Sequence, residues 1–486
     1  MSEQNSLGPA AADPKGQLRR VMGVWDVLLF NIAAVLGPRW VAAAAHNGTS
    51  SISLWVLAAL FFFLPTTFVI VELSTRFPVE GGLYVWSKEA FGEFHGFVAG
   101  WTYWVYTFFY FPGLLMASAA MCAYIGGAPT AYLAKDRTFL LIGSLLLLFV
   151  AVLLNIIGLN IGKWLQNAGG VSTYVPLMML VGMGAYLWFT RGPVTHFTVS
   201  NMLPTWNWDT VNFWPQIAFA FVGLELCSAM SEEIRDPHRT FPRAIFGSGV
   251  LIATIYILGT FAVLGMLPSE SVDAKSGVFQ ALTAGSAALK IGLFGVIAAM
   301  LVTVGNAGGV GSTVAGVARV PFVVGIDRYL PAAFGKIHPK WKTPWISILV
   351  QAVISCAILL LAQLKENPDS AYQALVDAGT ILYFIPFLYM YAAVIKLAYR
   401  ADRGANPDTV LIPGGTTGVW ITGTLGFLIV LAGIVLSLIP PGDAQNKWLF
   451  EAKLAGGTAF SVLFGLMLYA RGSRSKPRDV ARTAAE

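Results

Sequence analysis

Charge is scarce in this 486-residue chain. Asp, Glu, Lys and Arg together make up 12% of it, about half of the share in an average soluble protein, while 56% is hydrophobic. The sequence contains no nucleotide-binding glycine loop, no HExxH zinc motif and no nucleophile elbow. No polar stretch is long enough to form a soluble catalytic domain. These absences argue against an enzyme, and we expect no cofactor.

Cysteine and histidine are also rare. The three cysteines lie in apolar segments, and their odd number argues against a disulfide framework. The five histidines fall near expected helix ends or loops and show no metal-site spacing, so no metal is expected. These residues are Cys122, Cys227 and Cys356, and His46, His95, His196, His238 and His338.

Long apolar runs are what the sequence has in abundance. About 20 apolar residues cross the ~30 Å hydrocarbon layer of a bilayer, so each such run predicts a transmembrane helix. The fold class we predict is an all-α polytopic membrane protein in the lipid bilayer, with twelve transmembrane helices. The expected spans (TM1 to TM12) are 22–46, 52–74, 95–125, 138–159, 170–190, 211–233, 242–267, 291–318, 344–364, 370–396, 418–440 and 448–470.

The basic residues predict the orientation. Of the 31 lysines and arginines, 22 fall in the two tails (1–20 and 472–486), in the connections on the same side and at the helix ends that adjoin them. Basic residues collect on the cytoplasmic side of inner-membrane proteins, so both termini are expected in the cytoplasm and the protein in the plasma (inner) membrane. The net charge of +6 therefore reflects topology rather than a nucleic-acid partner. The first span is expected to act as the targeting signal, because no cleavage site precedes it.

Two of the spans are interrupted. Gly37 and Pro38 lie near the middle of TM1, and proline removes a helix donor and clashes one turn back. Gly223 lies at a comparable depth in TM6. The two breaks are 186 residues and five spans apart, so the second unit is inverted relative to the first. Paired interruptions in the two halves indicate an inverted-repeat transporter whose site lies at the middle of the membrane.

Three charged residues lie within membrane reach. Glu225, beside Gly223, is costly in an apolar segment and indicates a substrate or ion path, or else a paired or protonated tie between helices. Arg39, one turn past the TM1 break, could hold an anionic group, pair with Glu225, or face the extracellular vestibule. Asp377 in TM10 is either a proton site or a structural hydrogen-bond partner.

TM8 contains a stretch of small residues, Gly305 to Gly316. Small residues let membrane helices approach closely, which is the favoured interpretation. The alternative is that Ser312 and Thr313, together with Thr173 in TM5, supply hydroxyl oxygens to a sodium ion.

Several stretches resemble the amino acid–polyamine–organocation (APC) superfamily of permeases. They occur in family order over most of residues 20–400, and the TM1 break is somewhat similar to the bacterial glutamate/γ-aminobutyrate antiporter branch. The stretches are ELSTRFPVEGGLYVWS from Glu72, FGEFHGFVAGWTYW after it, FAFVGLELCSAMSEEIRDPHRTFPRAI in TM6, GIDRYLPAAFGKIHPKWKTP after TM8, and LVDAGTILYF in TM10.

The resemblance implies a leucine-transporter-type fold. In that fold residues 21–400 form a five-plus-five inverted repeat with TM1 and TM6 broken, and residues 401–471 add TM11 and TM12. The amino acid would lie between the broken helices, with the family's carboxylate-binding turn on Val35, Leu36 and Gly37, of which only Gly37 matches the family pattern. Phe219 corresponds to the family's aromatic gate and Glu225 to its acid. The implied substrate-binding residues are Ala34, Val35, Leu36, Gly37, Phe219, Val222, Gly223 and Glu225. Thr173 occupies the position where many members carry a lysine.

The expected function is a secondary transporter of an amino acid or amine. The broken TM1 suits a substrate carboxylate at the start of its second half, and the carbonyls that end the first halves suit an ammonium group. A membrane amino-acid sensor on the same fold is the alternative. For coupling, a proton carried by Glu225, or plain exchange, is favoured over sodium. If Arg39 faces the site, acidic substrates are expected.

Overall fold

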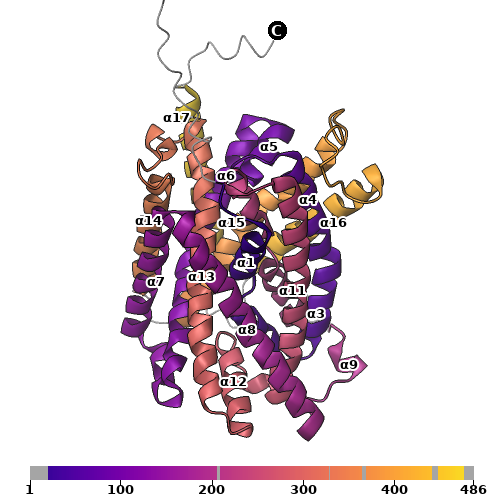
Figure 1. Ribbon diagram of the computed structural model, residues 1–486, viewed down its shortest axis with the longest axis vertical. Helices are drawn as coiled ribbons and strands as arrows, with labels where there is room; N and C mark the ends of the chain where they lie inside the picture. The colour runs from indigo at the N-terminus through magenta and orange to yellow at the C-terminus, as the bar shows by residue number, and fades with distance from the viewer. Residues whose placement is uncertain (1–19, 205–207, 328, 364–367, 440–446, 475–486) are drawn as a thin grey trace, which may run out of the picture.

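The computed structural model describes residues 20–204, 208–327, 329–363, 368–439 and 447–474. Within these residues the chain is helical and contains no strand, only one isolated bridge between Met22 and Ile234. The helices run roughly along one long axis as a bundle (Figure 1). The all-α prediction is therefore confirmed. The predicted tails 1–20 and 472–486 fall almost entirely outside the described residues.

Eleven helical stretches in the described part of the chain are long and apolar enough to cross a membrane. A twelfth helix, α14, has a shorter apolar part, Trp345–Leu361. Each of the twelve predicted spans coincides with one of these stretches. In order they are α1 (Val24–Val35) with α2 (Pro38–His46), α3 (Ser50–Ala58) with η2 (Ala59–Phe63) and α4 (Leu64–Arg76), α6 (Glu93–Cys122), α7 (Arg137–Ile157), α8 (Leu159–Arg191), α10 (Trp208–Ala220) with η5 (Leu224–Glu233), α11 (Pro237–Met266), α13 (Leu293–Ile326), α14 (Trp345–Gln363), α15 (Pro368–Leu397), α16 (Gly415–Ser437) and α17 (Lys447–Arg474).

Short helices that were not predicted from the sequence connect the spans. They include α5 (Leu83–Phe91) at one end of the bundle and α12 (Gly277–Ala288) at the other (Figure 1). The remaining short elements are η3 (Ala123–Gly126), η4 (Ala128–Lys135), α9 (Val199–Met202), η6 (Ser269–Ser271) and η7 (Ala332–Gly335).

The predicted break in the first span is present. Helix α1 ends at Val35, Leu36 and Gly37 are extended, and α2 begins at Pro38. Proline is favoured at the first position of a helix because its missing N–H would have no partner there. The same residue that ends α1 therefore starts α2.

The sixth span is also broken, and it touches the first break. Helix α10 ends at Ala220, and Gly223 has φ +123°, a conformation that side-chain-bearing residues rarely adopt. A Cβ on Gly223 would lie 2.9 Å from Val35 Cγ2, so the contact between the breaks also requires glycine. Beyond this point the chain forms the 3₁₀ helix η5, a helix type that the sequence did not predict.

Small residues bring α13 close to its neighbours, as predicted. A Cβ on Gly309 would lie 2.6 Å from the carbonyl oxygen of Ala33 in α1, and Gly308 meets the backbone of Gly169 in α8. Such backbone contact is available only where side chains are absent. The stretch Gly305–Gly316 therefore holds α1, α8 and α13 together beside the first break.

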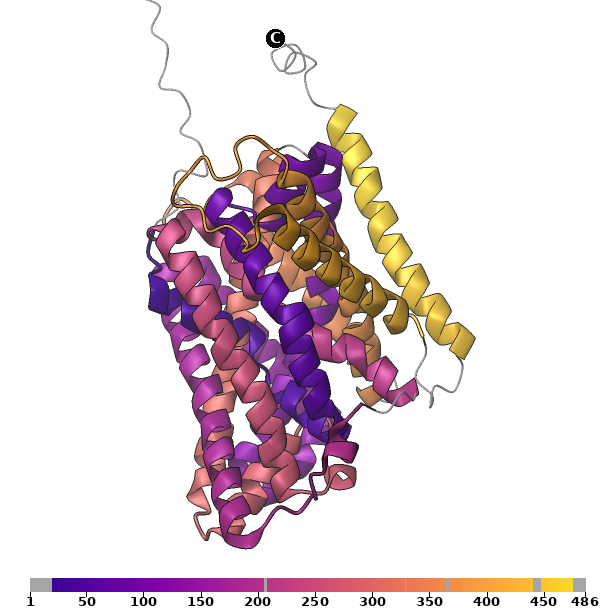
Figure 2. The same cartoon turned by 90° about the vertical axis from the view of Figure 1, so that its right-hand side faces the viewer.

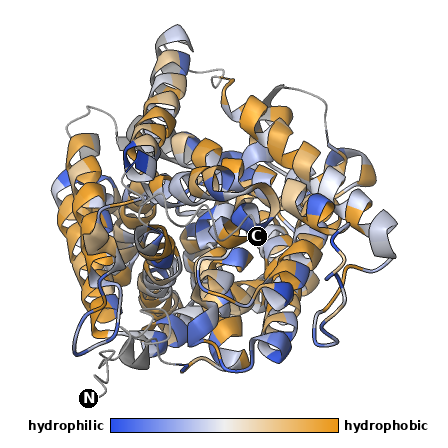
Figure 3. Ribbon diagram, turned by 90° about the horizontal axis from the view of Figure 1, so that it is seen from above, coloured by the Kyte–Doolittle hydropathy of each residue, from blue (hydrophilic) through white to orange (hydrophobic). Residues whose placement is uncertain are grey.

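The last span is the least buried of the eleven candidate spans in the described part of the chain. Helix α17 runs along the edge of the bundle (Figure 2), and only 11% of its apolar window is buried within the protein. Seen along the long axis, strongly hydrophobic ribbon lies at the periphery (Figure 3). This is the arrangement expected of helices whose outer faces contact lipid.

Candidate functional site

The hydroxyl of Tyr256, on α11, joins the two broken helices. It lies 2.7 Å from the carbonyl oxygen of Val35 and 3.0 Å from that of Ala220, so its one proton is shared between the two ends. The same hydroxyl accepts the amide N–H of Gly37 at 3.2 Å. Helix ends leave backbone groups without intrahelical partners, and buried ones must be satisfied. The Tyr256 hydroxyl is a hydrogen-bond partner for backbone groups of both breaks, namely the carbonyls of Val35 and Ala220 and the amide of Gly37.

A small cavity lies beside the first break. Its volume is about 20 Å³, room for about one water molecule, so an amino acid fits only after the surrounding helices separate. It is lined by residues of α1, α2, α6, α8 and α13. The predicted site residues among them are Ala34, Val35, Leu36, Gly37, Arg39 and Thr173.

Arg39 is the one charged residue in the lining of this cavity. It is 5% exposed and lies in the first turn of α2. Its guanidinium donates to the hydroxyl of Tyr110 at 3.1 Å and lies 4.5 Å from the centre of the Trp40 ring. Stacking and a hydroxyl partner fix the direction of the planar guanidinium. Arg39 thus belongs to the closed interior of the protein rather than to an open vestibule.

Glu225, on η5, is held by three donors. Its side chain is 1% exposed. Oε1 accepts the hydroxyls of Tyr103, at 2.9 Å, and of Tyr383, while Oε2 accepts the amide of Gly223 at 3.0 Å. Among the described residues Glu225 has no cationic partner, so the predicted alternative of an ion pair with Arg39 is wrong. The carboxyl group ties η5 to α6 and α15 by hydrogen bonds instead.

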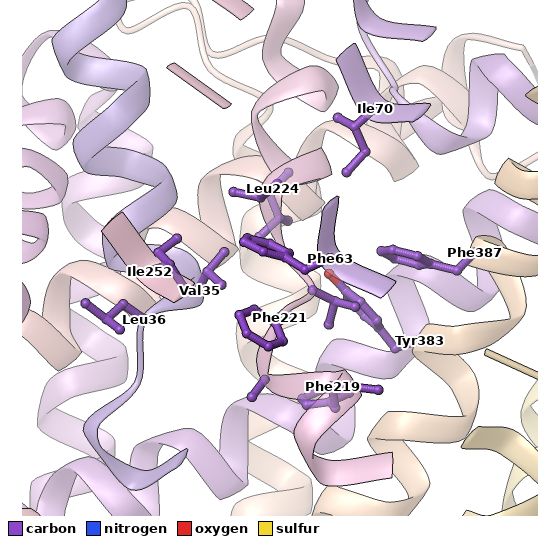
Figure 4. Close-up of a cluster of buried hydrophobic side chains, with 14 of the residues drawn as sticks. Val35, Leu36, Phe63, Ile70, Phe219, Phe221, Leu224, Ile252, Tyr383 and Phe387 are labelled. Atoms are coloured by element: carbon purple, nitrogen blue, oxygen red, sulfur yellow. The ribbon is translucent and has the colours of Figure 1, made fainter. Parts of the chain in front are cut away.

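Phe219 lies between these two groups. Its ring packs edge-on against Trp40, at 5.8 Å, and Tyr383, at 5.4 Å between ring centres, and it is also 5.8 Å from Tyr110. Figure 4 shows Phe219 near Tyr383, with Val35 and Leu36 across the broken segment. One aromatic layer therefore separates the cavity of Arg39 from the tyrosine cluster around Glu225.

The remaining candidate residues are placed less centrally. Val222 and Gly223 are buried in the second break, but neither lines the cavity. Ser312 and Thr313 are buried in α13 away from the cavity lining, and Thr313 donates to the carbonyl of Gly309 in its own helix, 3.0 Å away. The structure does not bring these two hydroxyls together with Thr173 around the cavity. Asp377 lies at the start of the apolar part of α15, also outside the lining.

Sequence reasoning missed the tyrosines of this site. Tyr103, Tyr110, Tyr256 and Tyr383 come from three helices and are all far in sequence from the groups that they contact. A buried tyrosine usually needs a partner for its hydroxyl, which is the only signal that the sequence offered. Asn306 in the cavity lining was missed as well.

Two broken helices that face each other at mid-bundle, in an all-helical membrane protein, define the class of secondary transporters with discontinuous helices. Residues 22–460 match the family described as amino acid permease. The chain belongs to that family, and it is a transporter of amino acids or related amines rather than an enzyme.

Three relatives cover 79% to 92% of this chain. An uncharacterised transporter of Legionella pneumophila is 29% identical over 91% of this chain and 95% of its own. A probable agmatine/putrescine antiporter of Lactococcus lactis is 25% identical, covering 92% and 94%. A serine/threonine exchanger of Bacillus subtilis is 28% identical, covering 79% and 84%. These relatives are transporters, and nothing in them supports the sensor alternative.

Solved structures show the same fold. The transporter MhsT, crystallised with L-phenylalanine, aligns with a TM-score of 0.63 at 12% identity, covering 86% of this chain and 98% of that one. A manganese transporter of Eremococcus coleocola aligns with a TM-score of 0.57 at 12% identity, covering 95% and 98%. The predicted leucine-transporter-type fold is therefore confirmed.

Proposed function

We propose that this permease carries amino acids with an acidic side chain, and that Arg39 binds that side chain. The observation that carries the proposal is the lining of the cavity beside the first break, which includes a buried guanidinium and no carboxylate. A guanidinium binds a carboxylate through two parallel hydrogen bonds, and a buried charge favours an opposite charge strongly. The Arg39 guanidinium would repel the second positive charge of a dicationic amine.

The two breaks supply the contacts for the common part of an amino acid. The positive dipole end of α2 suits the α-carboxylate near Val35, Leu36 and Gly37, and the Gly37 amide can exchange the Tyr256 hydroxyl for that carboxylate. The ammonium group can replace the Tyr256 hydroxyl as the partner of the carbonyls of Val35 and Ala220. Substrate entry then loosens the contact between the two breaks, which links binding to alternating access.

For coupling, a proton on Glu225 or plain exchange fits the site better than sodium. Two phenol groups and one amide surround Glu225, and a tyrosine hydroxyl can donate to a carboxylate or accept from a protonated carboxyl. Gain or loss of a proton would therefore rearrange Tyr103 and Tyr383 while Glu225 keeps hydrogen-bond partners in both forms. The hydroxyls of Ser312 and Thr313, proposed as sodium ligands, lie apart from the cavity.

The test is uptake into proteoliposomes that are loaded with unlabelled amino acids. We expect glutamate or aspartate to compete with the labelled substrate better than serine, agmatine or putrescine. Arg39→Ala should lower the apparent affinity for acidic substrates about ten- to hundredfold, because a hydrogen bond to a charged group contributes about 1.5–3 kcal/mol. Arg39→Lys keeps the charge but loses the planar guanidinium, so its affinity for acidic substrates should lie between those of the wild type and Arg39→Ala.

Arg191→Ala is the matched control, because Arg191 is an exposed arginine outside the cavity lining, whose guanidinium donates to the backbone carbonyl of Ala288. It should leave selectivity unchanged. If the wild-type protein prefers serine or putrescine to glutamate, Arg39 is not a selectivity residue and the acidic substrate class is wrong.

A further inference from the structure

A second buried charged cluster lies at the end of the bundle that carries α5, away from the cavity. Arg319, on α13, is 0% exposed. Its guanidinium binds both carboxylate oxygens of Glu233, Nε at 2.9 Å and Nη2 at 3.2 Å, and Nη1 donates to the carbonyl of Ala315 at 2.6 Å. Two parallel hydrogen bonds and an ion pair satisfy Glu233 as a carboxylate.

Glu80 joins this cluster as a second acid. It lies in the turn between α4 and α5 and is also 0% exposed. Its Oε2 accepts the amide of Glu232 at 3.1 Å. Its Oε1 lies 3.9 Å from Arg319 Nε, but that Nε donates its hydrogen bond to Glu233. Oε1 of Glu80 has no hydrogen-bond partner among the described residues. Glu80 is therefore the less well satisfied of the two acids.

The charges of this cluster do not balance if both acids are ionised. Two buried carboxylates would share one guanidinium, and an uncompensated buried charge is strongly unfavourable. The charged groups that face Glu80 are Glu232 and Glu233 on η5 and Arg319 on α13. On α5, the titratable side chains of Tyr84 and Lys88 contact Asp327 instead. A proton on one acid restores neutrality.

We propose that Glu80 is a proton-binding site separate from Glu225, which holds a proton while the α4–α5 turn is closed over η5. The turn is closely packed there: the amide of Gly81 donates to the carbonyl of Ala229 at 3.3 Å, and a Cβ on Gly82 would lie 2.6 Å from Ser228 Oγ. Movement of η5 away from this turn would admit water to Glu80 and release the proton. The turn and η5 thus form a latch whose closed form binds one proton.

The stability of the closed latch should depend on pH. Burial, and next the nearby charge of Glu233, raise the pKa of Glu80 well above its ordinary value. A group with a raised pKa stabilises the closed form at pH values below its ordinary pKa, and that stabilisation is lost as the pH rises through the raised pKa. Alkaline pH should therefore loosen the latch.

Glu80→Gln, which resembles the protonated acid in shape and charge, tests the proposal on the full-length protein in vesicles. The infrared carbonyl band of protonated carboxylic acid should be present at neutral pH in the wild type and in Glu225→Gln, and reduced in Glu80→Gln. The thermal stability of the wild type should fall from neutral to alkaline pH, and that fall should be smaller in Glu80→Gln. Glu89→Gln, an exposed acid on α5 paired with Arg400, should behave as the wild type.

The proposal is overturned if Glu80→Gln keeps the wild-type carbonyl band, or if Glu225→Gln alone removes it. If Glu80→Gln fails to fold, Glu80→Asp tests the proposal instead. An aspartic acid in the same place should shift the carbonyl band rather than remove it. An unshifted band in Glu80→Asp would also overturn the proposal. None of these outcomes depends on the substrate, so they are independent of the acidic-substrate proposal.

Discussion

At the scale of single residues, the site combines one cation and one acid that do not pair. Arg39 is directed by Trp40 and Tyr110, and Glu225 is held by Tyr103 and Tyr383. The separation matters because a direct ion pair would neutralise both groups. Under the function proposed above, each acts on a different partner, Arg39 on the substrate and Glu225 on a proton.

Glu225→Gln should abolish the dependence of uptake on a pH gradient if Glu225 carries the coupled proton. Glutamine keeps the volume and can still accept a hydrogen bond from a tyrosine, but it cannot titrate. The measurement is uptake into proteoliposomes driven first by a pH gradient and then by a sodium gradient. Exchange without a gradient should survive. Full pH dependence in Glu225→Gln would clear this residue of the proton role, and a strict need for sodium would contradict proton coupling altogether.

At the scale of elements, the two broken helices are stabilised by one side chain from a third. The hydroxyl of Tyr256 serves the carbonyls of Val35 and Ala220 and the amide of Gly37. Its ring stacks on Trp55, with 4.5 Å between ring centres. The ring therefore stays in place when only the hydroxyl is removed.

Tyr256→Phe should destabilise the closed contact between the breaks by about 1–3 kcal/mol, because it leaves buried backbone groups without a partner. We expect a lower melting temperature and a changed apparent substrate affinity, measured on purified protein and in proteoliposomes. Tyr124→Phe is the control, since it removes a single hydrogen bond to Ser276 at 3.1 Å. Equal effects of the two substitutions would show that Tyr256 has no special role at the breaks.

The elements were predictable from the sequence where their causes are local. Apolar length predicted the spans, and Pro38 and Gly223 predicted the breaks, since proline and glycine act on their own stretch of backbone. The 3₁₀ form of η5 and the partners of Glu225 were not predictable. Tyr103 and Tyr383 are 122 and 158 residues away from Glu225, and only the tertiary fold brings them to it. The cluster of Glu80, Glu233 and Arg319 was missed for the same reason.

At the scale of the whole molecule, the connections separate into two ends as the distribution of basic residues predicts. Lys163, after TM4, donates to the carbonyl of Val21 before TM1, and Arg235, after TM6, donates to that of Arg20. At the other end, His46, the last residue of TM1, has its Nδ1 2.7 Å from the carbonyl oxygen of Val272, which follows TM7. The relative sidedness of these connections follows from such contacts. The absolute orientation in the membrane remains a prediction from the charges.

Labelling with a membrane-impermeant maleimide on intact cells tests that orientation. Ser269→Cys, in the connection after TM7, should react from outside, because the basic residues place that end opposite the cytoplasm. Lys340→Cys, in the exposed connection between η7 and α14, should react only after the cells are opened. The unmodified protein is the control for its own cysteines, of which Cys227 is buried and the other two are partly exposed. Reaction of Lys340→Cys in intact cells together with protection of Ser269→Cys would reverse the topology. The cluster of Glu80 and Arg319 would then face the outside, and its proton would be exchanged with the external medium.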